Sequence, residues 1–544
     1  MSFHTRALVL IVALSSLALF VACGGNSFNR GTPPPSGAFN NSNLNGTYVF
    51  SVTGSDATGF FQTIAGAFTA NGSGVVTGGT IELNNAGTGF TPPLSITGGN
   101  YSVGADGRGG FLNGGGLNLN TSSGTLSFDF VLSSSSHGLI TEFDGNGTGS
   151  GTLDLQSAVS QADINGKSYA FNLSGVYSVS STTGVQTSFA TVGSLTVDAS
   201  GNITGFEDFN ENGTSSVCGP VLTVCTITGG SISLATMPGT ATILTNGNVT
   251  TLNFDVYPVD ATHLKFIETD SLPFAAGDAF TQSSSIPAGN YVFTLAGFDS
   301  LAQGPFTSAG IITTDGNGNI TNASIQDIND FGNVPNPVTF TGTYSAVSGG
   351  SSLLTLTGFV NGNNGAGCNP CQFAAYPSSG GLQLLEIDNG GSTAGVAYPQ
   401  SATTLASGEG YGMNLTGFNF GSVNGAFEED AIAEFVNTNG NFAGLIDFND
   451  QGSVTPAQHF SSSYSADSTV PGRGVVTPGT NGFNLVSYVV DSSTAVFVEI
   501  DNNPVQVGIG SFAVQNASAS SNAAAAHLKV LRLVRGAKST AKRR

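Results

Sequence analysis

The chain has 544 residues, and only 9% of them are charged, well below the roughly 25% of ordinary globular proteins. Its 77 glycines are about twice the usual share, while 38 phenylalanines and 12 tyrosines can supply several hydrophobic cores. This composition argues against a disordered chain and against a fold of charged amphipathic helices. Between Gly31 and Ala526 the formal charge is −30, from four basic and 34 acidic residues, which disfavours nucleic acid as a partner.

The first 22 residues are typical of an export signal. Arg6 is followed by a mostly apolar run, Ala7–Val21, which is shorter than the about 20 residues that span a membrane. The run ends in Phe20-Val-Ala-Cys23, which resembles a bacterial lipobox, although Phe20 stands where Leu is usual. The resemblance implies a lipoprotein signal peptide over 1–22 and lipid on Cys23, which would anchor the chain in a membrane. An ordinary secretory signal is the alternative.

Two further expectations concern the ends of the chain. Gly24 follows the cysteine where an Asp would indicate retention in the inner membrane, so the resemblance favours the outer membrane or cell surface. Residues 23–41, with three consecutive prolines, are expected to form a flexible tether. The basic C-terminal tail, 517–544, could form a short amphipathic helix on anionic lipid or remain a solvated tail.

The rest of the chain repeats one unit four times. Each unit opens with a glycine, an aromatic residue and alternating apolar positions, and the tyrosines of this opening segment are 121, 122 and 120 residues apart. A second shared feature is a turn and then a strand ending in an acidic residue, an apolar residue and Asn. A third is Glu-x-Asp near the end of the unit. These features predict four β repeats, 42–157, 163–283, 284–402 and 403–516.

Each unit is expected to be all-β. Unit one divides into eight short segments of strand pattern separated by Gly-, Ser- and Asn-rich turns. The segments are Thr47–Thr53, Phe60–Thr69, Val75–Leu83, Ile96–Val103, Gly109–Leu119, Leu126–Leu132, Gly138–Phe143 and Gly151–Leu155. Because the connections are short, neighbouring strands should pair antiparallel and close into an eight-stranded up-and-down barrel. An immunoglobulin-like β-sandwich is the alternative.

Two resemblances bear on the repeats. The opening Gly-x-aromatic strand is similar to that of lipocalin and avidin-like barrels, but it uses Tyr, since the chain has no Trp. The elements Gly46/Tyr48, Asp315–Ile320, Gly107–Gly109 and Gly472–Gly474 resemble those of tandem-repeat envelope lipoproteins of acidobacteria. This second resemblance implies a location in the cell envelope and supplies no activity.

The Glu-x-Asp pairs are the main candidate ligand site. Residues i and i+2 of a strand share a face, so both carboxylates should project together. They could contact a sugar-like ligand at a barrel mouth, or they could accept hydrogen bonds from turn amides at the strand end. A pair of glycosidase carboxylates is the least favoured interpretation. The eight residues are Glu142, Asp144, Glu268, Asp270, Glu386, Asp388, Glu499 and Asp501.

The four remaining cysteines form two close pairs, Cys218 with Cys225 and Cys368 with Cys371. In an exported chain they predict two local disulfides, with a redox pair or half a zinc site as the alternative for the second pair. Asp315–Asn319 has the spacing that opens a calcium loop, but the later EF-hand positions do not match.

No catalytic, metal or cofactor motif is present. We therefore expect a non-enzymatic, lipid-anchored envelope protein that displays four β domains and binds a glycan, a polymer or another surface. A structural spacer without a ligand is the alternative, and a carbohydrate-active enzyme the least favoured. A polar cavity inside the barrels would favour binding, whereas interiors filled by Phe and Leu would favour the spacer.

Overall fold

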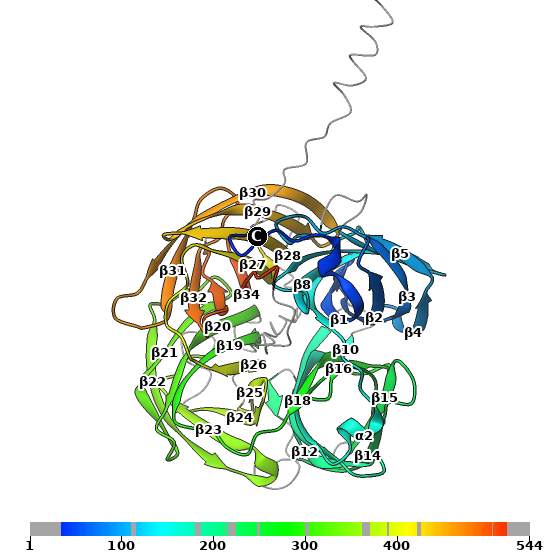
Figure 1. Cartoon of the computed structure of the whole chain (residues 1–544). Coiled ribbons are helices and arrows are strands. Elements are labelled where there is room, and N and C mark those ends of the chain that lie inside the picture. The colour runs from blue at the N-terminus through cyan, green and yellow to red at the C-terminus, as the bar shows by residue number, and fades with distance from the viewer. Residues whose placement is uncertain are drawn as a thin grey trace, which may run out of the picture. The chain divides into compact units, whose positions relative to one another are not determined.

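The computed structural model describes residues 34–518 apart from 110–115, 180–185, 212, 216–224, 247–250, 300–303, 362–369, 389–390, 422–425 and 503. The described residues belong to one compact unit, Gly31–Arg544. Their secondary structure is mainly strand, with very little helix (Figure 1). The predicted signal peptide, Cys23, Cys218, Cys368 and most of the basic tail lie outside the described residues.

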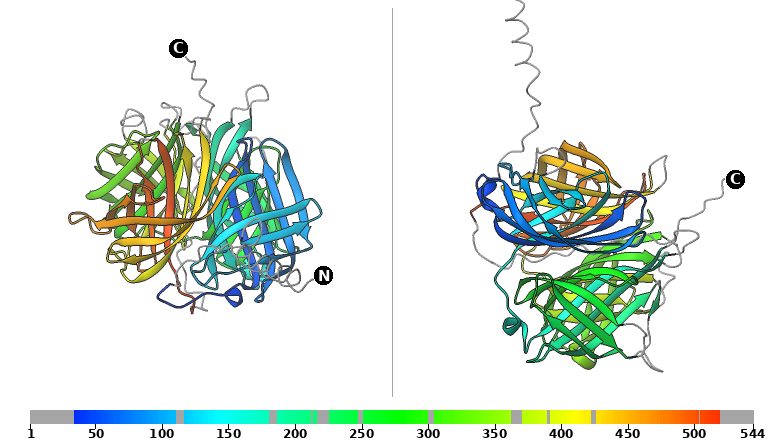
Figure 2. Two further views of the ribbon diagram at one scale, coloured as in Figure 1. Left: turned by 90° about the horizontal axis from the view of Figure 1, so that it is seen from above. Right: turned by 90° about the vertical axis from the view of Figure 1, so that its right-hand side faces the viewer.

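The strands form four closed, antiparallel barrels, which we call barrels one to four in chain order. The predicted fold class is thereby confirmed, and the sandwich alternative is excluded. Figure 1 shows barrel one in blue and cyan and barrel four in yellow, orange and red. In the two other views of Figure 2, the strands of each wall lie tilted and curve around its interior.

Barrel one closes through eight strands, with the last strand pairing with the first. The strand predicted at Ile96–Val103 starts earlier and is broken at Thr97 into two segments, of which only the second lies in the closed cycle. The strands are β1 (Asn45–Asp56), β2 (Phe61–Asn71), β3 (Val75–Asn85), β4 (Gly89–Ile96), β5 (Gly98–Tyr101), β6 (Leu117–Thr121), β7 (Gly124–Leu132), β8 (His137–Glu142) and β9 (Gly147–Leu155).

Barrel two has the same plan, with one short strand outside the cycle, and it follows the single helical turn α2 (Gln161–Ile164). Its closure pairs the first strand with the last. The strands are β10 (Ser168–Val179), β11 (Gln186–Val197), β12 (Ile203–Glu211), β13 (Thr214–Ser215), β14 (Cys225–Ser233), β15 (Gly239–Thr245), β16 (Leu252–Asp260), β17 (His263–Glu268) and β18 (Phe274–Thr281).

Barrels three and four each contain eight strands and close without an additional one. Barrel three consists of β19 (Gly289–Asp299), β20 (Gly304–Thr314), β21 (Asn319–Asp330), β22 (Val338–Ala346), β23 (Ser352–Thr357), β24 (Cys371–Ser378), β25 (Gly381–Glu386) and β26 (Gly391–Pro399). Barrel four consists of β27 (Glu409–Asn419), β28 (Phe427–Thr438), β29 (Asn441–Asp450), β30 (Ser453–Ala466), β31 (Arg473–Pro478), β32 (Leu485–Val489), β33 (Thr494–Glu499) and β34 (Gln506–Val514).

The tyrosine that opens each repeat belongs to the hydrophobic core of its barrel. Tyr48 and its three counterparts are at most 4% exposed, and each hydroxyl donates a hydrogen bond to a backbone carbonyl. Tyr48, for example, donates to the carbonyl of Ser135 at 2.6 Å. A buried phenol needs such an acceptor, which explains why the opening aromatic residue is Tyr and not Phe.

The barrel interiors are filled with apolar side chains. In barrel one, Phe50 packs against Phe68 and Phe128, with ring centroids 6.0 and 5.3 Å apart. Phe50 lies opposite Gly66 on the neighbouring strand, where an added Cβ would come within 3.0 Å of the phenyl ring. The same Phe–Gly pair occurs in barrels two and three, and barrel four replaces it with Met413 and Ala433. A large side chain therefore faces glycine and a smaller one faces alanine, so the combined volume of the two facing residues varies little between the barrels.

Candidate functional site

The features shared by the four repeats meet where neighbouring barrels contact each other. We call these contacts seams 1–2, 2–3, 3–4 and 4–1, after the barrels that they join. In seam 2–3, Asn210 at the end of β12 donates to the carbonyls of Glu386 and Gly391 in barrel three, at 2.9 and 2.8 Å. Its side-chain oxygen accepts from the amide of Gly213 at 3.0 Å, so this buried side chain is fully engaged.

The same contact recurs around the molecule. Asn329 donates to the carbonyls of Glu499 and Gln506 across seam 3–4, at 2.8 and 2.6 Å. Asn449 donates to those of Glu142 and Gly147 across seam 4–1, both at 2.8 Å. The Asn of each acidic-apolar-Asn segment thus contacts the Glu of Glu-x-Asp in the next barrel. Because barrel four contacts barrel one, the seams form a closed cycle.

Seam 1–2 is a weaker version of this contact. Asn84 donates to the carbonyl of Glu268 at 2.5 Å, and its side-chain oxygen has no hydrogen-bond partner. Lys265 adds an ion-pair cluster here. Its ammonium group lies 3.2 Å from Asp154 of barrel one and 3.3 Å from Asp278 of barrel two, and it donates to Thr152 at 2.7 Å. Charge pairing across this seam accompanies the single amide contact.

The acidic residue two positions before each Asn also crosses a seam. Asp208 accepts from the hydroxyl of Tyr376 at 2.7 Å in seam 2–3. In seam 3–4, Asp327 accepts from Tyr488 and from both Nε and Nη2 of Arg473, at 2.8 Å for each Arg473 contact. Buried ionisable groups of this kind are paired because an isolated charge in the interior is costly.

Seam 4–1 replaces the tyrosine with an arginine. The strand position held by Tyr376 and Tyr488 is Val131 in barrel one, which packs against Leu139 and Ile432. Arg108, from the Gly-Arg-Gly segment, instead pairs with Asp447 of barrel four and with Asp106, the latter at 3.2 Å. Arg108 is only 1% exposed, so this is a buried ion-pair cluster between the first and last barrels.

The two halves of Glu-x-Asp occupy different surroundings. Asp144, Asp270, Asp388 and Asp501 each accept a hydrogen bond from the backbone amide of a residue 16 or 17 positions earlier, at 2.7–3.1 Å. The donors Ser127, Asn253 and Gln372 lie within the neighbouring strands β7, β16 and β24 and not in the turn that follows each Asp. The Glu half is buried, at no more than 1% exposure. Whether any of the eight residues contacts a ligand stays a prediction.

Burial changes the charge state of the glutamates. It raises the pKa of Glu142, Glu268, Glu386 and Glu499 well above the usual range. The neighbouring Asp carboxylate is a further cause in each case, because like charges disfavour ionisation. Burial and the neighbouring carboxylate therefore both favour the protonated form of these glutamates, which lessens the like-charge repulsion around them.

Other carboxyls around the seams behave in the same way. Burial, together with a hydrogen bond to Asp255, raises the pKa of Glu82 to about 10. Burial also raises the pKa of Glu434 to about 8, and those of Glu207 and Glu429 to about 7.

Sequence inspection found the acidic-apolar-Asn segments but gave them no role, because spacing along one chain does not show which repeat contacts which.

We expect the seam asparagines to differ in their contribution to stability. Asn329→Ala should lower the free energy of unfolding by about 2–3 kcal/mol, because it leaves two buried carbonyls and the amide of Gly332 without their partner. Asn84→Ala should cost about 1 kcal/mol, since only one hydrogen bond is lost. Urea denaturation of both variants would measure this, and equal losses would contradict the pairing described here.

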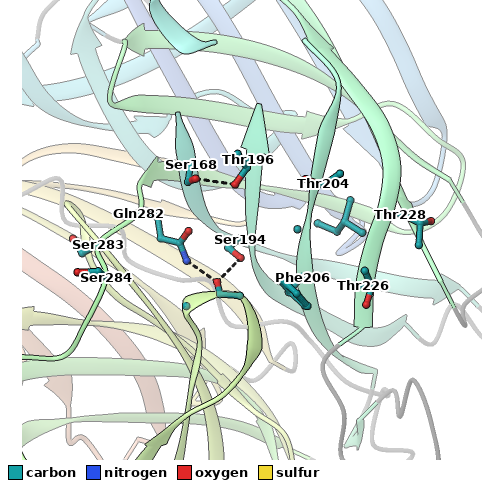
Figure 3. Close-up of a pocket in the computed structure, with 14 residues that line it drawn as sticks. Ser168, Ser194, Thr196, Thr204, Phe206, Thr226, Thr228, Gln282, Ser283 and Ser284 are labelled. Atoms are coloured by element: carbon teal, nitrogen blue, oxygen red, sulfur yellow. Dashed lines mark hydrogen bonds between the residues drawn. The ribbon is translucent and has the colours of Figure 1, made fainter. Parts of the chain in front are cut away.

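A pocket of about 840 Å³ opens on the outer wall of barrel two, beside seam 2–3. It is lined by strands β10, β11, β12 and β14, by the connection to barrel three, and by the turn at Gly349-Gly350 (Figure 3). Eight of its fourteen lining residues are Ser or Thr and none is charged, so the lining is uncharged and rich in hydroxyl groups. Sequence inspection did not find this pocket.

Two of the predicted disulfide cysteines, Cys225 and Cys371, are disulfide-bonded. Their predicted partners lie outside the described residues, so the pairing stays a prediction. Among the described residues, no group of three or more His, Cys, Asp or Glu side chains could hold a metal ion. His137 and His263 instead lie beside Asp154 and Asp278, at 2.7 and 2.9 Å. No helix in the described part of the chain is long and apolar enough to cross a membrane.

The fold defines a class of protein, a tandem array of eight-stranded antiparallel barrels. No protein-family model matches the sequence, and no curated protein matches it. Among solved structures, transferrin binding protein B from serogroup B Neisseria meningitidis is 10% identical over 70% of this chain and 84% of that one, with a TM-score of 0.19. A mutant of transferrin binding protein B from Haemophilus parasuis Hp5 is 9% identical over 69% of this chain and 83% of that one, also with a TM-score of 0.19.

A third solved structure, a putative AttH from Nitrosomonas europaea, is 10% identical over 66% of this chain and 97% of that one, with a TM-score of 0.16. Identities near 10% and TM-scores below 0.2 carry no ligand or partner over to this chain.

Proposed function

We propose that this chain is a non-enzymatic binding protein of the cell envelope that binds its ligand on the outer surface of its barrels. The observation that carries the proposal is the contrast between interior and exterior. The barrel interiors are packed with apolar side chains, as Phe50, Phe293 and Phe497 illustrate. The uncharged pocket with its Ser and Thr hydroxyls lies instead on the outer wall of barrel two.

A glycan or another hydroxyl-rich polymer is the proposed ligand. Pockets that bind such molecules need hydroxyl and amide groups at fixed positions, and the lining of this pocket supplies both. The seams support the same proposal, because they hold the pocket walls, which come from two barrels, in a fixed arrangement.

A purely structural spacer is the second candidate. It is favoured by a specific observation, namely that filled interiors and four seams make a rigid body without needing any ligand. An array of glycans, polysaccharides and purified envelope proteins, probed with the full chain, separates the two candidates. Specific retention on any one ligand class supports a binding protein. Uniform absence of retention would favour the spacer.

Lipid attachment at Cys23 is the proposed route to the envelope. The Phe20–Cys23 segment and the preceding apolar run support it. We expect Cys23→Ser, made in a chain that lacks the basic tail, to move from the membrane fraction to the soluble exported fraction. Two lipid chains anchor a protein stably, whereas none remains in this variant. Unchanged partition into membranes, measured by fractionation and immunoblotting, would refute the proposed anchor.

A further inference from the structure

The pocket on barrel two has a regular polar wall. Ser168 on β10 pairs with Thr196 on β11, which in turn pairs with Thr204 on β12. Adjacent strands lie about 4.8 Å apart, so the three residues form a row across three neighbouring strands. Thr196 and Thr204 are exposed, and the Ser168 and Thr196 hydroxyls lie 2.8 Å apart. Each hydroxyl can both donate and accept, so the row suits a ligand that does the same.

The opposite side of the pocket is a turn from barrel three that is fixed in place. The carbonyl of Gly349 accepts hydrogen bonds from Ser194 at 3.0 Å and from Gln282 at 2.9 Å (Figure 3). Gly349 has a φ of +74°, and an added Cβ would come within 2.0 Å of the Phe206 ring. Only glycine combines a positive φ with the absence of a Cβ that would collide with the ring, so the close contact of this turn with Phe206 depends on Gly349.

Phe206 differs from its counterparts in the other barrels. It lies two residues before Asp208, and the same position is Ile325 in barrel three and Leu445 in barrel four. Those two side chains are buried, whereas Phe206 is partly exposed and lines the pocket. Figure 3 shows it between Ser194 and Thr226, its partners on the two neighbouring strands. An aromatic side chain is therefore available here to pack against the apolar face of a ligand.

We propose that this pocket binds a neutral carbohydrate segment, with Phe206 packing against a sugar ring and the Ser168–Thr196–Thr204 row bonding to its hydroxyls. The inference rests on the proposed binding function and names its ligand class and position. Neutrality follows from charge, because no basic side chain lines the pocket and the surrounding chain is strongly acidic. A phosphate, sulfate or uronate group would be repelled there.

The test uses the full chain and two sets of probes. Neutral gluco-, manno- and galacto-oligosaccharides are titrated by calorimetry beside oligogalacturonate of equal length. We expect binding of at least one neutral series and none of the acidic one. Phe206→Ala and the double variant Thr196→Val/Thr204→Val should each weaken that binding at least tenfold. Valine has nearly the same shape as threonine, so the double variant should still fold. It therefore tests the pocket even if Phe206→Ala fails to fold.

Matched controls alter similar side chains far from the pocket. Thr77→Val removes an exposed hydroxyl on barrel one, and Phe331→Ala removes a phenyl group that is 41% exposed on barrel three. Both should bind as wild type does. If the pocket variants bind the neutral oligosaccharides as tightly as wild type does, this inference is wrong and the binding function stands. The same holds if the chain binds only oligogalacturonate. Absence of retention across the whole array overturns the proposed function and this inference with it.

Discussion

The protein should become less stable as the pH rises from 5 to 9. Glu82, Glu207, Glu429 and Glu434 ionise near pH 4.5 in the unfolded chain, but their pKa values in the folded state are about 10, 7, 7 and 8. Between those limits the folded state binds more protons than the unfolded one. The free energy of unfolding therefore falls as pH rises, by about 1.4 kcal/mol per pH unit for each such group, until its folded pKa is passed.

Burial is the main cause at all four glutamates, and nearby acids add to it. Asp255 faces Glu82, Asp208 faces Glu207, Asp450 faces Glu429, and Asp106 faces Glu434. The positive charge of Arg108 acts against the rise in the pKa of Glu434. Carboxyls with lowered pKa values, such as Asp467 at about 2, are ionised in both the folded and the unfolded state throughout this range. Their contribution to the free energy of unfolding therefore does not change between pH 5 and 9.

Urea denaturation at intervals of half a pH unit would measure the slope. Glu82→Gln imitates the protonated form of that side chain, so the variant should lose stability less steeply than wild type. Asp163→Asn alters an exposed acid with a lowered pKa and should leave the slope unchanged. Stability that is constant or that rises between pH 5 and 9 would show that the buried glutamates are not held neutral.

The second large effect is expected at seam 4–1. Arg108→Met should lower the free energy of unfolding by about 3–5 kcal/mol, because removing one partner leaves buried carboxylates without compensation. Asp106 and Asp447 pair with Arg108 directly, and Asp129 interacts with it electrostatically. Met keeps much of the side-chain volume, so loss of charge and not a cavity should dominate the result.

Arg473→Met supplies the matched comparison at seam 3–4. Arg473 is 9% exposed, and its main partner Asp327 keeps a hydrogen bond from Tyr488 when the guanidinium is lost. The loss there should be smaller than at Arg108. Equal losses in urea denaturation would contradict the view that the tyrosine in seam 3–4 takes over part of the role that arginine has in seam 4–1.

Much of the fold could be predicted because it depends on local patterns. Strand alternation, Asn-Gly turns and short connections were sufficient to predict eight-stranded barrels, and the recurring tyrosines gave the number of repeats. These features require only contacts between neighbouring strands.

The seams could not be predicted, because they depend on contacts between repeats. Asn449 and the carbonyl of Glu142 are 307 positions apart, and nothing in the spacing indicates that the fourth repeat meets the first. The pocket was missed for a similar reason. Phe206 stands where the third and fourth repeats have Ile and Leu, which is visible in the sequence, but its place beside a turn from the next barrel is not.

The closed cycle of seams makes the chain's starting point arbitrary. Asn43, before the first strand, donates to the carbonyl of Ala517, after the last, at 2.9 Å, and Ser36 donates to that of Gln515 at 2.6 Å. A circular permutant that joins these segments and opens the connection between barrels two and three would keep all four barrels and all four seams. Its first repeat would be the present third, and its N-terminus would emerge next to the neutral pocket.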